Sequence, residues 1–164
     1  MLTGNDFIEL LYLPISDNRV NNMMNILKIE QPIIDKNFKE DGYTSIVDEF
    51  NDVEVKFSDS SRLNINNSYS VFFTGIDFFS TTKIKLPLNI DKQMNYAQLS
   101  TLLGLPNYES TRLPIKVWIK QRVDKSFYTI SVSFKQDETI SKISLSIDSR
   151  KHLESSRYFN KVDK

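Results

Sequence analysis

Residues 86–106 read LPLNIDKQMNYAQLSTLLGLP: a Leu-Pro pair, a short helical stretch and a Leu-Gly-Leu-Pro ending. A similar phrase, LPISDNRVNNMMNILKIEQP, occupies residues 13–32 and again runs from Leu-Pro to a proline. The two phrases start 73 residues apart (86 − 13), and strand-like sequence follows each of them. A repeat of this length in a chain of 164 residues predicts two related α+β units in tandem rather than a solenoid.

Each phrase carries the signals of a short helix. In the first, Ser16 or Asp17 can cap a helix that runs to about Lys28, with apolar side chains at spacings of three and four. In the second, Asn95 is the expected cap and Gly104 the expected stop.

Alternation of apolar and polar residues predicts strands after both phrases. The expected strands are 53–57, 69–73, 76–79, 115–119, 127–134 and 140–147, with a bend at 74–75 and an irregular acidic segment at 33–52. Alternation of this kind is typical of an antiparallel sheet with one solvated face. We therefore predict an α+β fold of two tandem units, each a short helical segment followed by an antiparallel β-sheet. The expected divisions are an acidic unit (1–82), a basic unit (83–148) and a charged tail (149–164) that is loose or helical.

Composition allows a well-packed core and reveals an uneven charge distribution. The chain is 40% hydrophobic and 12% aromatic, unlike a disordered protein. Its net charge is zero, which argues against general nucleic-acid binding. However, residues 1–82 hold 6 Lys/Arg and 13 Asp/Glu, whereas residues 83–164 hold 15 and 8, so the halves carry −7 and +7. Such asymmetry favours an electrostatic steering surface.

Residues that an enzyme or metal site would need are scarce. The chain has no cysteine, which excludes disulfides, thiolate metal sites and cysteine nucleophiles. Its single histidine, His152, lies in a polar segment, where a solvated side chain is expected rather than a base or ligand. The four glycines are scattered and form no phosphate loop. We predict no catalytic residues, no metal and no cofactor.

The start of the chain and its hydropathy predict a cytoplasmic protein. The first residues lack the basic and apolar regions of a secretory signal. No apolar run approaches the ~20 residues of a membrane span. We expect no membrane partner.

Two regions are candidates for binding a protein partner. The first is an acidic stretch comprising Asp41, Tyr43, Asp48, Glu49, Asp52 and Glu54. It is either a solvated acidic loop and strand edge or a docking patch for a basic partner. The second is the Ser/Thr-lined face of the later strands, where Trp118 and Tyr128 would anchor a contact, since aromatic residues dominate such interfaces. The alternative is that Trp118 covers the sheet, packs under the tail or lies inside, because a shift of one residue exchanges the two faces.

The second phrase, followed by Trp118 and two amphipathic strands, resembles a unit found in small outer-membrane-assembly lipoproteins and, duplicated, in the beta-lactamase inhibitor protein. The chain also resembles immunity proteins encoded beside bacterial polymorphic toxins and type VI secretion effectors. The first phrase has Lys28 where that pattern has glycine. The resemblance covers most of residues 13–147, and it implies the fold and a protein-binding role without assigning individual residues.

Together these features predict an immunity protein that neutralises a cognate toxin by occluding its active site. The acidic patch would enter a basic cleft, and the aromatic anchors would slow release. The alternative is a secretion adaptor or chaperone that binds an effector without inhibiting it. A third hypothesis is an enzyme acting on a small molecule. An exposed sheet edge would also make a homodimer easy to build.

Overall fold

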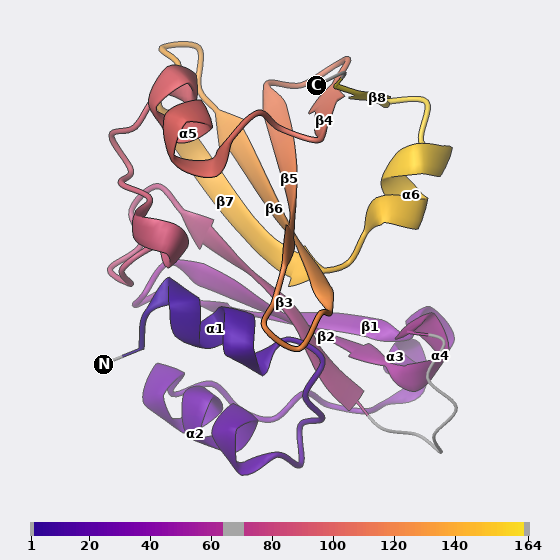
Figure 1. Cartoon of the computed structure of the whole chain (residues 1–164). Helices are drawn as coiled ribbons and strands as arrows, with labels where there is room; N and C mark the ends of the chain where they lie inside the picture. Colours follow the sequence, from indigo (N-terminus) through magenta and orange to yellow (C-terminus); the bar gives the residue numbers. More distant parts are fainter. Residues whose placement is uncertain (1, 64–70, 163–164) are drawn as a thin grey trace.

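A single antiparallel sheet organises the chain in the computed structural model, which describes residues 2–63 and 71–162 (Figure 1). Across the sheet, the strands are β1 (Tyr43–Asp48), β2 (Val53–Asp59), β3 (Val71–Phe79), β7 (Ile140–Ile147), β6 (Phe127–Phe134), β5 (Ile115–Gln121), β4 (Tyr108–Ser110) and β8 (Phe159–Lys161). The helices are α1 (Gly4–Leu10), α2 (Asn18–Leu27), α3 (Lys36–Asp41), α4 (Ser60–Leu63), α5 (Tyr96–Leu103) and α6 (Arg150–Ser155), with a 3-10 turn, η1 (Pro87–Asn89). The predicted α+β class and antiparallel pairing are confirmed.

The strand order divides the sheet into two meanders, β1-β2-β3 and β5-β6-β7, which meet where β3 pairs with β7. Gly75 lies at this junction, and a Cβ atom there would come within 2.6 Å of the Leu145 carbonyl oxygen. The two backbones can therefore approach this closely only because position 75 has no side chain.

The predicted helix caps are present in the first and second phrases. The Asp17 carboxylate accepts a hydrogen bond from the Arg19 amide (2.8 Å) at the start of α2. Asn95 and Gln98 form a reciprocal capping box at the start of α5, and Gly104 ends that helix with φ +82°. Helices that short gain little from propensity, so their stability comes from packing on the sheet.

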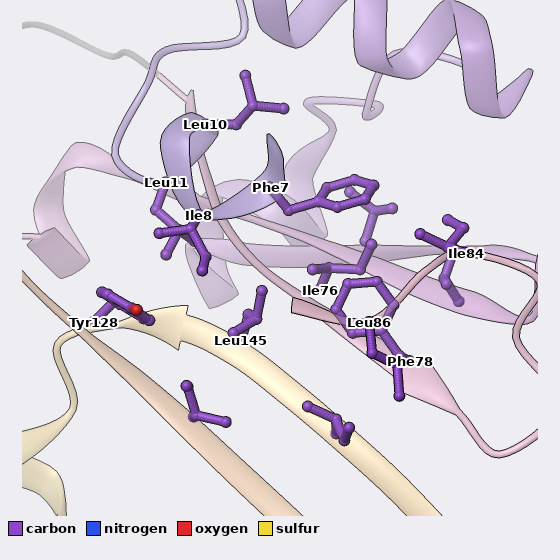
Figure 2. Close-up of a cluster of buried hydrophobic side chains, with 14 of the residues drawn as sticks. Phe7, Ile8, Leu10, Leu11, Ile76, Phe78, Ile84, Leu86, Tyr128 and Leu145 are labelled. Carbon is purple, nitrogen blue, oxygen red and sulfur yellow. The ribbon is translucent and has the colours of Figure 1, made fainter. Parts of the chain in front are cut away.

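The main core lies between one face of the sheet and α1, α2 and α5. Figure 2 shows Phe7 and Ile8 of α1 directed toward the apolar side chains of β3 and β7. Phe7 is fully buried, and its ring meets that of Phe78 edge-on at 5.7 Å. Residues from both meanders belong to this one cluster, among them Phe57 and Ile130.

The opposite face is covered locally by α6, which lies across the sheet from α1, α2 and α5 (Figure 1). Leu153 of α6 packs with Val117 of β5 and Tyr108 of β4 in a second, smaller cluster. Consequently β5 is covered on both faces, and its tryptophan, Trp118, is buried whichever face it occupies.

Several expectations from the sequence are corrected by the structure. The segment 33–52 is not irregular, since it contains α3 and β1. No bend interrupts β3 at 74–75, and the irregularity is a register shift between β2 and β3. The tail is helical over α6, as one of its two expected forms, and then adds β8 to the sheet. The part of the expected strand at 69–70 lies outside the described residues.

The longest helix, α2, has ten residues. Within the described residues, no helix combines the length and apolar character that crossing a membrane requires.

Candidate functional site

Six of the eight predicted partner-binding residues lie together at one edge of the sheet. Tyr43 and Asp48 are the first and last residues of β1, the edge strand, and Asp41 ends the helix just before it. Glu49 and Asp52 lie in the loop between β1 and β2, and Glu54 lies on β2. The fold thus gathers residues that the sequence suggested as an acidic patch.

The loop of this hairpin is held in shape by Asp48. Its carboxylate accepts hydrogen bonds from the amides of Phe50 (3.0 Å) and Asn51 (3.2 Å), and from the Asn51 side chain (2.6 Å). Asp48 is only 7% exposed. It is therefore a structural cap, and the carboxylate that the loop presents to solvent is Glu49.

Large apolar side chains are exposed beside these carboxylates. Phe50 at the loop tip is 72% exposed and Val47 of β1 is 58% exposed. Six of the ten large exposed hydrophobic residues in the described chain lie on β1, on its loop or on the segment 26–34 that faces it: Ile26, Ile33, Ile34, Tyr43, Val47 and Phe50. Clusters of this kind on a protein surface mark interaction sites, whereas scattered single residues do not. We call this region the β1 edge surface.

Two hollows follow one another along β1. The first, of about 480 Å³, lies between residues 43–46 and residues 30–38, and it carries the carboxylates of Glu30, Asp35 and Asp41. The second, of about 730 Å³, lies between residues 47–51 and residues 26–29, with Leu2 and residues 83–84 completing it. Its lining is largely apolar. The Lys83 ammonium lies 3.7 Å from the centre of the Phe50 ring, which helps to hold the aromatic side chain in place.

The two predicted aromatic anchors lie elsewhere and are buried, which is a correction. Trp118 is 1% exposed, and its indole N–H donates to the Gly104 carbonyl (2.8 Å) at the end of α5. Tyr128 is 5% exposed within the main core. Because an anchor must reach a partner, neither residue belongs to the β1 edge surface. Trp118 lies inside, which was the alternative left open by the sequence.

Trp118 was expected on the solvated face of the sheet, but the two faces of β5 are exchanged relative to that expectation. Trp118 stands opposite Ile130 in the ladder and faces the main core, whereas Val117 stands opposite Ser131 on the hydroxyl-lined face. The Lys120 side chain extends along the core face to donate to the Leu103 carbonyl (2.6 Å). Lys116 and Lys120, which share the face of Trp118, therefore did not mark that face as exposed to solvent, because a lysine stem can lie along an apolar surface.

The hydroxyl-lined face contains a buried carboxylate that serves the fold. Asp77 of β3 is 1% exposed and accepts from Lys56 of β2 (2.6 Å) and Lys142 of β7 (3.0 Å). Burial opposes ionisation of the Asp77 carboxyl, but the two lysines and the Ser144 hydroxyl outweigh it and hold its pKa below the ordinary value. This arrangement ties three strands together.

Residues suited to metal or acid–base chemistry do not gather in the described part of the chain. No group of three or more His, Asp or Glu side chains there is placed to hold a metal ion. His152 is exposed in α6.

The apolar half of the β1 edge surface was missed from the sequence. A signal was available, because Phe50 sits among Glu49, Asn51 and Asp52 in a segment that a turn should fill with polar residues. This signal could be interpreted only once β1 was known, and the acidic residues on both sides of β1 made its segment look irregular in the sequence.

No protein-family model, no curated protein and no solved structure matches this chain.

Proposed function

We propose that this protein is an immunity protein, which binds a cognate toxin through the β1 edge surface and blocks its active site. The observation that carries the proposal is the concentration of exposed apolar side chains beside exposed carboxylates on one sheet edge. Apolar anchors such as Phe50 would slow release, and the carboxylates would select a basic partner and speed encounter. A basic cleft is characteristic of enzymes that act on nucleic acids or nucleotides, so that class of toxin fits best.

The resemblance noted in the sequence supports this choice over other protein-binding roles. As part of the same proposal, the two meanders are repeated units of common origin, each preceded by its Leu-Pro phrase. The proposal places the inhibition in the cytoplasm, and fractionation of native cells tests that placement.

The test begins with a pull-down from native cells and mass spectrometry of what co-elutes. The partner's activity and its toxicity to cells are then measured with and without this protein. A stoichiometric partner that kills cells alone and is silenced by this chain is the expected result. A partner that remains active in the complex would replace the proposal with a secretion adaptor, and turnover of a small molecule would replace it with an enzyme.

Two matched charge-reversal variants test whether the toxin binds at the β1 edge surface. Glu49→Lys in the β1–β2 loop should weaken neutralisation, whereas Glu138→Lys in the exposed β6–β7 turn makes the same charge change elsewhere and should not. Equal neutralisation by both variants would remove the β1 edge surface from the proposal.

A further inference from the structure

The hydrogen-bonding pattern of β1 shows which of its backbone groups face outward. The Asp59 amide donates to the Gly42 carbonyl (3.1 Å), so residues 42 and 59 form a hydrogen-bonded pair. In an antiparallel ladder such pairs alternate with non-bonded ones. Thr44, Ile46 and Asp48 therefore bond to β2, and the N–H and C=O groups of Ser45 and Val47 point away from the sheet.

The wall that faces this edge, residues 30–34, belongs to no helix or strand. Helix α2 ends with the Ile29 amide bonded to the Met24 carbonyl, and the next helix begins at Lys36. Between them, within the described chain, no backbone hydrogen bond or β-bridge joins residues 30–34 to β1. Two stretches of backbone thus run beside each other with hollows of about 480 and 730 Å³ between them.

The two hollows form a groove whose lining is apolar and acidic. The lining passes from Ile46 to Val47 along β1 and from Glu30 to Ile29 on the opposite wall, so the hollows lie end to end. Its exposed charged groups are four carboxylates and two ammonium groups: Glu30, Asp35, Asp41 and Glu49 against Lys28 and Lys83. Charge complementarity therefore favours a basic occupant, and the apolar lining favours one that also carries aliphatic side chains.

We propose that the partner contributes an extended segment that adds to β1 as a ninth strand, with basic and apolar side chains in alternation. This inference rests on the proposed function and specifies its mode of contact. Main-chain hydrogen bonds to Ser45 and Val47 would supply affinity. Alternate side chains of the segment would enter the groove and supply specificity.

The first experiment uses a defined probe, a fluorescein-labelled peptide of alternating Lys and Val as long as the six residues of β1. Fluorescence anisotropy should show saturable binding to the native protein. A peptide of alternating Glu and Val should not bind, because the groove is acidic. Failure of the Lys-Val peptide to bind would overturn the inference.

A backbone variant separates strand addition from simple charge attraction. Ser45→Pro removes the outward N–H but no charge, and proline is tolerated on the free side of an edge strand. It should weaken peptide binding about tenfold, since one hydrogen bond and the pairing geometry are lost. Ser45→Ala keeps the N–H and should bind like the native protein. Equal binding by the two variants, with equal circular dichroism, would overturn strand addition.

Hydrogen exchange provides a measurement that needs no variant. On the 15N-labelled native protein, the Lys-Val peptide should slow exchange of the Ser45 and Val47 amides. The Thr44 and Ile46 amides, already bonded to β2, should change little. Binding without slower exchange at Ser45 and Val47 would contradict the inference.

If a toxin is neutralised equally by Ser45→Pro and native protein, strand addition fails while the proposed function stands. If the peptide binds but no toxin is silenced, the proposed function fails.

Discussion

Phe50 is the residue whose replacement tests the proposed role of the β1 edge surface most directly. Phe50 is 72% exposed, and its ring contacts the Lys83 ammonium rather than the core. We expect Phe50→Ala to weaken partner binding by about 2 kcal/mol, or roughly thirtyfold in Kd. Calorimetric titration with the purified partner measures the loss.

The control for Phe50 is Leu113→Ala. Leu113 is 60% exposed and lies between β4 and β5, far across the strand order from β1. Both variants should unfold at nearly the native urea midpoint. Equal affinity of the two variants would show that the aromatic ring is not an anchor.

At the scale of elements, Asp77 links the two meanders through Lys56 of β2 and Lys142 of β7. Its folded-state pKa lies below the unfolded value of about 3.9. Ionised Asp77 therefore stabilises the fold fully above that value, and this contribution is lost as the pH falls through the folded-state pKa. We expect Asp77→Asn to cost about 2 kcal/mol at neutral pH and much less at pH values below the folded-state pKa.

Urea unfolding of native and Asp77→Asn protein across the acidic range measures this dependence. Glu138→Gln, in an exposed turn, is the control and should leave the curve unchanged. A difference between native and Asp77→Asn protein that stays constant with pH would assign the effect to packing rather than to charge.

The elements also show how far the sequence could be used for prediction. Helices α2 and α5 were predictable because caps and apolar spacing agree locally, and in α5 a terminal glycine agrees with them. Strand β1 was not predictable, because three of its six residues are of intermediate burial and its burial pattern has no period of two. The face of β5 was also beyond local pattern, since coverage by α5 on one side and α6 on the other is decided by residues distant in the chain.

At the scale of the whole molecule, the shared core predicts one cooperative unit. Phe57 and Ile130 come from the two meanders and belong to the same buried cluster. Trp118, the only tryptophan, lies in the second half. Its fluorescence and far-ultraviolet circular dichroism, which reports both halves, should follow the same urea transition. Two separated midpoints would mean that the halves unfold independently.

The opposite net charges of the two halves, −7 and +7, predict salt-dependent association. Between about 0.05 and 0.5 M salt, the association rate with a basic partner should fall about tenfold while dissociation changes little. Stopped-flow mixing measures both rates. Glu49→Lys should lower the rate at low salt, and an association rate independent of salt would argue against steering.

The side chains that line the groove at Ile33, Val47 and Phe50 are exposed, whereas the main core lies under α1, α2 and α5. Substitutions at these surface positions are nearly neutral for folding. In evolutionary terms, the edge is free to vary while the scaffold stays constant. A lineage could therefore acquire a new partner through a few changes along one strand. Under the proposed function, two descendants with the same fold would then protect against different toxins.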